Sequence, residues 1–100
     1  MDALALVEGF EWDEANARKS EDKRDVTQAE AEQVFLNAPL LLLKDEAHSG
    51  LEDRFHALGK TDDGRLLHVT FTLRQAGTRI RVISARDMHR KERSRYAQEA

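Results

Sequence analysis

The stretch RLLHVTFTLR, residues 65–74, decides the fold class because its apolar and polar residues alternate from Leu67 to Arg74. Apolar side chains occupy every second position from Leu67 to Leu73, and polar side chains occupy the positions between them, from His68 to Arg74. Successive side chains of a β-strand point to opposite faces of the sheet, so one face of this strand is apolar and the other is polar. We therefore expect a strand in an antiparallel sheet with one face against the core.

Turn sequences border this strand on both sides. TDDG (61–64) separates it from RFHALGK (54–60), and QAGT (75–78) separates it from RIRVISAR (79–86). Short turns rich in Gly, Asp and Asn between alternating runs are typical of hairpins. The sequence therefore predicts a three-strand antiparallel meander.

A helix and a short strand are expected before the meander. Thr27 and Glu30 form a capping-box pattern, an apolar stripe follows at helical spacing, and Pro39 prevents continuation of the helix. The apolar run LLLLK (40–44) that comes next is short, and its place after a proline favours a buried strand.

Two further helices are expected nearer the chain ends. Residues 13–23 form a charged segment with Asp13 as a plausible N-cap, and Phe10 and Trp12 are expected to anchor it. Asp87 is expected to cap a C-terminal helix that continues to the end of the chain.

This order of elements predicts an α+β fold. We expect two N-terminal helices, a short strand and a three-strand antiparallel meander forming one sheet, and a C-terminal helix. The helices are expected on the apolar face, which leaves the polar face open. One hundred residues fit a single domain (1–100), in which residues 1–9 are expected to be a flexible extension.

Composition excludes several kinds of chemistry. The chain has no cysteine, so disulfides, thiol catalysis and cysteine-bound metals are excluded. No paired-histidine metal motif or Gly-rich phosphate loop occurs, and we expect neither a metal nor a cofactor. The apolar segment ALALV (3–7) is too short for a signal peptide or a membrane span, so no membrane association is expected and the cytoplasm is the expected location.

Charge is divided unevenly along the chain. Residues 1–50 hold five Lys or Arg and twelve Asp or Glu, whereas residues 51–100 hold eleven and seven. A split of this kind favours two surfaces, one for an acidic polymer and one for a basic partner. The alternative is an ordinary solvated surface with many salt bridges.

Positive charge gathers beside the polar face. His68 and Arg74 lie on that face, next to a strand that carries Arg79 and Arg81, and Arg86 ends the same strand. In regular strand geometry Arg86 points to the face opposite Arg79 and Arg81. One guanidinium group can donate hydrogen bonds to two oxygens of the same phosphate, so this grouping of arginines favours a phosphodiester ligand. Among the four histidines, His68 is the best candidate for proton transfer because its neighbours are polar.

The last helix has two different sides. One side of the helix is expected to dock against the domain and carries Met88, Glu92 and Tyr96. The other is expected to face solvent and carries His89, Arg90 and Arg93. Direct DNA binding through this basic helix is a further alternative, although no helix-turn-helix pattern accompanies it.

Several motifs occur in a distinctive order: FEWDEA, VTQAEAEQVF, PLLLLKDEAHS, EDRFHALG, GRLLHVTFTLR, RIRVISAR and RKERSRY. From Phe10 to Tyr96 the chain thus resembles the BrnT family, toxins of bacterial type II toxin–antitoxin modules. The resemblance implies a RelE-like fold and a ribonuclease activity that inhibits translation by cleaving RNA. It also implies a cognate DNA-binding antitoxin of the BrnA type, dimeric in the complex, that neutralises the toxin and represses the operon.

The resemblance also implies site residues. As candidate catalytic residues it assigns Lys23, Glu52, Arg54, Arg74, Arg81 and Arg86. The candidate RNA-binding residues are Trp12, taken from the same motifs, and Arg24, His68, Arg79, Arg90 and Arg93, taken from the charge pattern.

One position departs from the family pattern. The family has N-x-x-K-H-G-V-S-F in the first-helix region, and this chain keeps Lys23 but has Arg24 at the histidine position. Arginine does not deprotonate, so it can hold a phosphate but cannot replace a proton-transfer histidine. The leading hypothesis is a metal-independent endoribonuclease. The alternative is a catalytically degenerate module that binds an antitoxin or RNA without cleavage.

Overall fold

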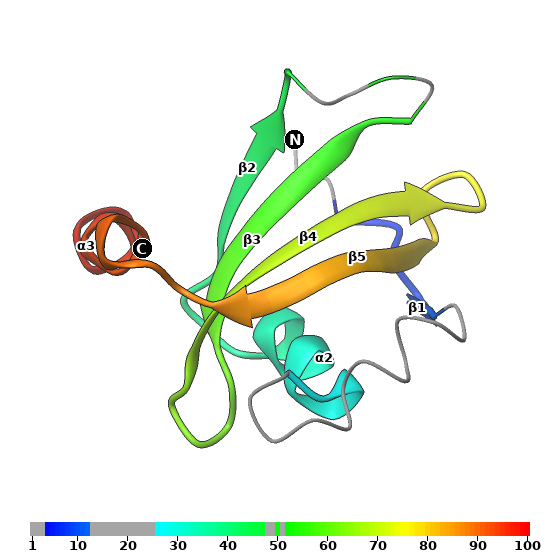
Figure 1. Ribbon diagram of the computed structural model, residues 1–100. Helices are drawn as coiled ribbons and strands as arrows, with labels where there is room; N and C mark the ends of the chain where they lie inside the picture. The colour runs from blue at the N-terminus through cyan, green and yellow to red at the C-terminus, as the bar shows by residue number, and fades with distance from the viewer. Residues whose placement is uncertain (1–3, 13–25, 48–49, 51) are drawn as a thin grey trace.

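A computed structural model describes residues 4–12, 26–47, 50 and 52–100 of the chain. Its elements follow one another along the sequence (Figure 1). They are β1 (Gly9–Glu11), α2 (Gln28–Leu36), β2 (Leu41–Asp45), β3 (Arg54–Lys60), β4 (Leu66–Arg74), β5 (Arg79–Asp87) and α3 (Arg90–Glu99). In the described part of the chain neither helix is long and apolar enough to cross a membrane.

The predicted fold was wrong in its sheet, which has five strands and is mixed. The strand order is β1-β5-β4-β3-β2, and β1 runs parallel to β5 while the other pairs are antiparallel. The expected three-strand meander is part of a longer antiparallel run of four strands, because β2 pairs antiparallel with β3. Strand β1 has only three residues, too few to show an alternating pattern in the sequence.

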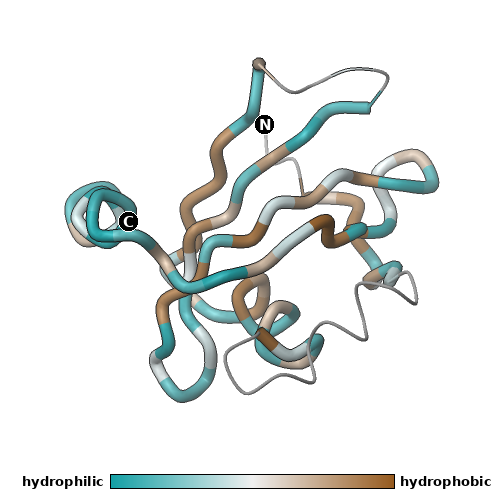
Figure 2. Tube along the Cα trace, viewed as in Figure 1, coloured by the Kyte–Doolittle hydropathy of each residue, from teal (hydrophilic) through white to brown (hydrophobic). Residues whose placement is uncertain are grey.

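The expected placement of the helices was also wrong. Helix α2 packs on the face of the sheet that carries Val69 and Phe71, through Ala31 and Val34. Helix α3 packs on the opposite face, where Tyr96 contacts a second apolar cluster. Figure 1 shows the two helices well apart from each other, and Figure 2 shows that α3 is largely hydrophilic while apolar residues follow the strands. The helix expected at 13–23 lies outside the described residues.

We call the α2 side the core face and the α3 side the outer face. On β4 the outer face carries His68, Thr70, Thr72 and Arg74, as the sequence predicts. Helix α3 covers the His68 end of this face, because its apolar contacts include Leu58, the register partner of His68. The Arg74 end is left uncovered by α3, and the sheet face that was expected to be open is only partly so.

A β-bulge in β5 changes the direction of Arg86. Thr70 pairs with Ser84 and Phe71 pairs with Val82, so β5 has one residue more than β4 at this point. Such an insertion reverses the alternation of side chains beyond it. As a result Arg86 lies opposite His68, on the outer face. The expectation that Arg86 points to the face opposite Arg79 and Arg81 was therefore wrong.

Helix α2 begins and packs for local reasons. The Thr27 hydroxyl accepts a hydrogen bond from the Glu30 amide (3.1 Å), and the Glu30 carboxylate accepts one from the Thr27 amide (3.0 Å). These two bonds satisfy amide groups that have no partner within the first turn. The helix then lies close to β3, where a Cβ at Gly59 would come within 2.8 Å of a methyl carbon of Val34.

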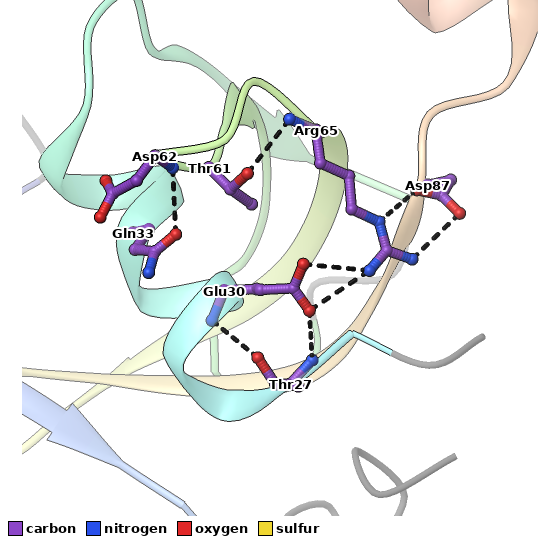
Figure 3. A network of polar contacts seen from close by, with 7 residues as sticks. All are labelled: Thr27, Glu30, Gln33, Thr61, Asp62, Arg65 and Asp87. Carbon is purple, nitrogen blue, oxygen red and sulfur yellow. Dashed lines mark hydrogen bonds and ion pairs between the residues drawn. The ribbon is translucent and has the colours of Figure 1, made fainter. Parts of the chain in front are cut away.

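Arg65 ties three elements together (Figure 3). Its guanidinium donates to both carboxylate oxygens of Glu30 in α2 and to both of Asp87 at the end of β5. Asp87 was expected to cap the C-terminal helix, but the helix begins at Arg90 and its N-cap is His89. Asp87 instead accepts two hydrogen bonds from Arg65 and so links the end of β5 to this network.

The chain before β1 contacts the body of the domain. Leu4 and Val7 pack against the main core, and the Glu8 amide donates to the Thr78 carbonyl (2.7 Å).

Candidate functional site

The uncovered part of the outer face contains a hollow of about 440 Å³. We call it the arginine hollow, since three of its side chains are guanidinium groups and Glu52 is the one carboxylate. It is lined by Gly50, Glu52, Arg54, Thr72, Arg74, Arg81 and Ile83. The cations come from three different strands, and cross-strand pairing places them in neighbouring rows. The lining therefore carries a net positive charge on a rigid sheet.

Glu52 organises one side of the arginine hollow. Its carboxylate accepts a hydrogen bond from the Thr72 hydroxyl (3.0 Å) and lies 3.1 Å from Nε of Arg74. The Arg74 Nε is buried, and the angle of this contact is not that of a hydrogen bond, so Glu52 and Arg74 form an ion pair only. Glu52 thus holds Arg74 at the wall of the hollow.

A second hollow, of about 360 Å³, lies where α3 meets the sheet. We call it the histidine hollow; it is lined by Leu43, His56, Leu58, His68, Arg86, Glu92 and Arg95. Arg86 and Glu92 form a bidentate pair here, with N–O distances of 2.7 and 2.9 Å. The hydrogen bonds from Arg86 lower the pKa of Glu92 to about 2, and those to Glu92 raise the pKa of Arg86. Both groups are therefore charged at neutral pH, and two hydrogen bonds join them to each other.

His68 is electrically neutral at pH 7. Burial, together with the nearby positive charge of Arg86, lowers the pKa of its imidazole to about 4 against the opposing effect of Glu92. Its Nε2 lies 3.8 Å from the Glu92 carboxylate, which is too far for a hydrogen bond. His68 can accept or donate a hydrogen bond to a ligand but contributes no positive charge.

His56 has the better-defined surroundings of the two imidazoles. Its Nε2 lies 2.8 Å from Oδ2 of Asp45, and its Nδ1 lies 3.0 Å from the hydroxyl oxygen of Thr70. The His56 and His68 rings are 4.8 Å apart. Sequence reasoning counted His56 among the four histidines considered for proton transfer but preferred His68, and it missed Asp45. The signal was present, because His56 follows Arg54 by two positions and a strand places both on one face.

The candidate residues predicted from the sequence fall into separate places. Glu52, Arg54, Arg74 and Arg81 come together in the arginine hollow. Arg86 and His68 share the outer face with them but lie in the histidine hollow. Lys23 and Arg24 lie outside the described residues.

The remaining candidates line neither hollow. Trp12 donates from its indole nitrogen to Glu32 of α2 (2.8 Å) and packs against the main core, on the other face of the sheet. Arg79 extends over Gly9 of β1. On α3, Arg90 is exposed, and Arg93 donates to the Met88 carbonyl (2.9 Å).

Three guanidinium groups around one hollow form a cationic surface whose charge and planar forks match the oxygens of phosphate-containing anions. The model of one family, described as "Ribonuclease toxin, BrnT, of type II toxin-antitoxin system", matches residues 12–92. The chain therefore belongs to the BrnT family of ribonuclease toxins. A comparison with curated proteins found no match. Membership implies an RNA target and an antitoxin partner.

Proposed function

We propose that this protein is a metal-independent endoribonuclease that holds the scissile phosphate of RNA in the arginine hollow. The observation that supports the proposal best is the gathering of Arg54, Arg74 and Arg81 around one concave surface on the outer face. Arginine stays charged at every relevant pH, and its planar fork matches two phosphate oxygens. A single-stranded RNA backbone offers such oxygens in an accessible form.

The reaction assigned to this site is an internal transesterification. The ribose 2′-oxygen attacks phosphorus, the bond from phosphorus to the 5′-oxygen breaks, and the products are a 2′,3′-cyclic phosphate and a free 5′-hydroxyl. Negative charge grows on the non-bridging oxygens as the phosphorane forms. Fixed cations that already face that position stabilise this charge without reorganising. Arg81 and Arg54 are assigned this role, and Glu52 positions Arg74 beside them.

Guanidinium groups supply the positive charge that a metal supplies in other nucleases. Within the described residues, no three His, Asp or Glu side chains gather into a possible metal site. We therefore propose that cleavage proceeds in the presence of EDTA.

The biological consequence proposed for this cleavage is inhibition of translation in the cytoplasm. A BrnA-like antitoxin that binds DNA is the proposed partner, and it is expected to neutralise the toxin in a hetero-oligomer with a dimeric antitoxin. An acidic antitoxin segment over the arginine hollow would block RNA both sterically and by charge.

RNA cleavage in EDTA tests the proposal. Wild type is compared with Arg81→Ala and Arg54→Ala, and Arg90→Ala serves as the control because that side chain is exposed on α3, outside both hollows. We expect each hollow variant to lose about 100-fold or more in cleavage rate and the control to retain activity. Unchanged cleavage by both hollow variants would contradict the site.

A non-catalytic binding module is the second candidate, and Arg24 at the family's histidine position favours it. Expression of the chain alone in a bacterium distinguishes the two candidates. Growth arrest supports the ribonuclease, whereas normal growth with a stably produced protein supports the binding module.

A further inference from the structure

We propose that His56 is the general base of this site, oriented by Asp45 and poised to take a proton from the ribose 2′-hydroxyl. This inference rests on the proposed ribonuclease function and assigns its proton-transfer step. The observation that carries it is the continuous chain of contacts from Asp45 through His56 to Thr70.

The contacts of His56 fix which nitrogen can act as a base. An ionised carboxylate only accepts hydrogen bonds, so Nε2 of His56 carries the hydrogen that points to Asp45 (2.8 Å). The neutral ring then has its lone pair on Nδ1, and the Thr70 hydroxyl donates to it (3.0 Å). A hydroxyl group already occupies the position at Nδ1 that a ribose hydroxyl would take. Because Nδ1 has a single lone pair, the Thr70 hydroxyl must turn away from it when the ribose hydroxyl takes its place.

The sheet places this nitrogen beside the arginine hollow. Arg54 and His56 lie two positions apart on the same face of β3, which separates their backbones by roughly 7 Å. Their register partners on β4, Thr72 and Thr70, are equally close to each other. A phosphate held by Arg54 therefore brings the ribose on one side of it toward His56.

The proposed step balances in atoms and charge. Nδ1 of His56 takes the proton of the 2′-hydroxyl as the 2′-oxygen bonds to phosphorus. The bond from phosphorus to the 5′-oxygen breaks, and the leaving oxygen takes a proton from water. The imidazolium formed on His56 faces the Asp45 carboxylate, which stabilises the new positive charge, and it then returns its proton to solvent. Asp45 is a positioning residue in this scheme.

His68 is less suited to this step even though its ring lies against that of His56. Its nearest carboxylate, Glu92, is 3.8 Å away and already makes two hydrogen bonds with Arg86. Nothing in the described residues orients the His68 ring as Asp45 orients that of His56. Comparison of His56→Gln with His68→Gln therefore distinguishes the two imidazoles as candidates for the base.

Charged or titratable groups from every neighbouring element face His56. They are Asp45 on β2, Arg54 on β3, His68 on β4, Arg86 on β5, and Glu92 and Arg95 on α3.

Single-turnover cleavage of an RNA oligonucleotide tests the assignment. We expect His56→Gln to lower the cleavage rate by about 100-fold or more, with binding of the same sequence as 2′-O-methyl RNA unchanged within about twofold. His68→Gln should lower the rate by less than His56→Gln does. His56→Gly should regain activity when imidazole is added to the buffer, which a purely structural histidine would not show. Asp45→Asn should slow cleavage by less than His56→Gln does.

The pH dependence gives a second readout. The acid limb of the rate profile, where the base becomes protonated, should disappear in His56→Gln and persist in His68→Gln. Cleavage by His56→Gln at the wild-type rate, or loss of rate in His68→Gln alone, would overturn the assignment while leaving the ribonuclease function intact. Absence of cleavage by wild type would instead overturn the proposed function and the assignment with it.

Discussion

Arg86 and Glu92 form a bidentate pair across the junction of β5 and α3, in which two guanidinium nitrogens of Arg86 each donate one hydrogen bond to a different carboxylate oxygen of Glu92. Glu92 also accepts a hydrogen bond from the His89 amide (2.8 Å) at the start of the helix. Helix α3 buries one side chain of its own, that of Tyr96, so this polar junction is a large part of what attaches it to the sheet.

Removing either partner of this pair should destabilise the domain. Arg86→Met and Glu92→Met are each expected to lower the free energy of unfolding by about 1 kcal/mol, and the double variant should lose less than the sum. Urea unfolding of all four proteins gives the coupling. Arg95→Met is the control, since its pair with Glu99 joins exposed residues within the helix. Additive losses in the double variant would show that the pair contributes no coupling energy.

Acid should destabilise the fold in two stages. The folded-state pKa of His68 is about 4 against an ordinary 6.5, so the unfolded chain binds more protons between these values and stability falls as the pH drops through them. The pKa of Glu92 is about 2 against 4.5, so its contribution is complete above pH 4.5 and is lost toward pH 2.

His68→Gln separates the two stages. Thermal unfolding followed from pH 7 to pH 3 should show the upper stage in wild type and not in this variant, while the lower stage remains in both. An identical decline between pH 6.5 and 4 in the two proteins would contradict the buried, neutral state of His68.

The Arg65 network in Figure 3 gives a prediction about α2. Arg65→Ala leaves Glu30 and Asp87 without their shared partner, and we expect a loss of about 1–2 kcal/mol in unfolding free energy. Arg65→Lys should recover only part of it, because an ammonium cannot bond to two carboxylates with the same fork. A lysine variant as stable as wild type would show that charge alone is sufficient.

The strands of the sheet were easier to predict than their arrangement. Alternation located β4 within one residue, and the capping box of Thr27 and Glu30 marked the start of α2. Strand β1 was missed because three residues carry no usable period. The sheet face against which α3 packs was predicted wrongly. The packed side of this helix has few apolar residues, so its sequence does not indicate which surface it covers.

The candidate site was predictable where it followed strand alternation. Alternation and strand order placed Arg74 beside Arg81, whereas Arg54 was taken from the family resemblance; the three come together because they sit at pleat positions that share a face. Arg86 was misplaced because a bulge cannot be read from one sequence. Asp45 and His56 are eleven positions apart in the sequence and lie on the paired strands β2 and β3. Their contact depends on the register of this pairing, which the alternation of residues along one strand does not reveal.

RNA binding should depend on salt through the cations of the arginine hollow. For single strands the logarithm of affinity falls with the logarithm of salt concentration, with a slope of roughly 0.7 for each phosphate neutralised. Arg81→Ala should weaken binding of 2′-O-methyl RNA and reduce the size of this slope by roughly 0.7, the value for one phosphate contact. Arg90→Ala should change neither the affinity nor the slope. A full wild-type slope in Arg81→Ala would place the phosphate contacts elsewhere.

Gly59 sets how closely α2 approaches the sheet. A Cβ at this position would come within 2.8 Å of Val34 Cγ1 and 3.2 Å of the Val34 carbonyl oxygen, and the carbonyl belongs to helix backbone that cannot turn aside. Gly59→Ala must therefore push α2 away from β3 or distort the strand. We expect a loss of about 1–3 kcal/mol in unfolding free energy, as in other overpacked cores.

Gly50→Ala is the matched control for this substitution. A Cβ there meets no atom within 4 Å, so the same chemical change should alter stability by less than about 0.5 kcal/mol. Urea unfolding of both variants measures the difference. The arginine hollow lies on the other face from α2, so Gly59→Ala should lower RNA cleavage only in proportion to the fraction unfolded. Equal stability of the two alanine variants would mean that α2 does not pack against β3 as closely as the contacts of Gly59 require.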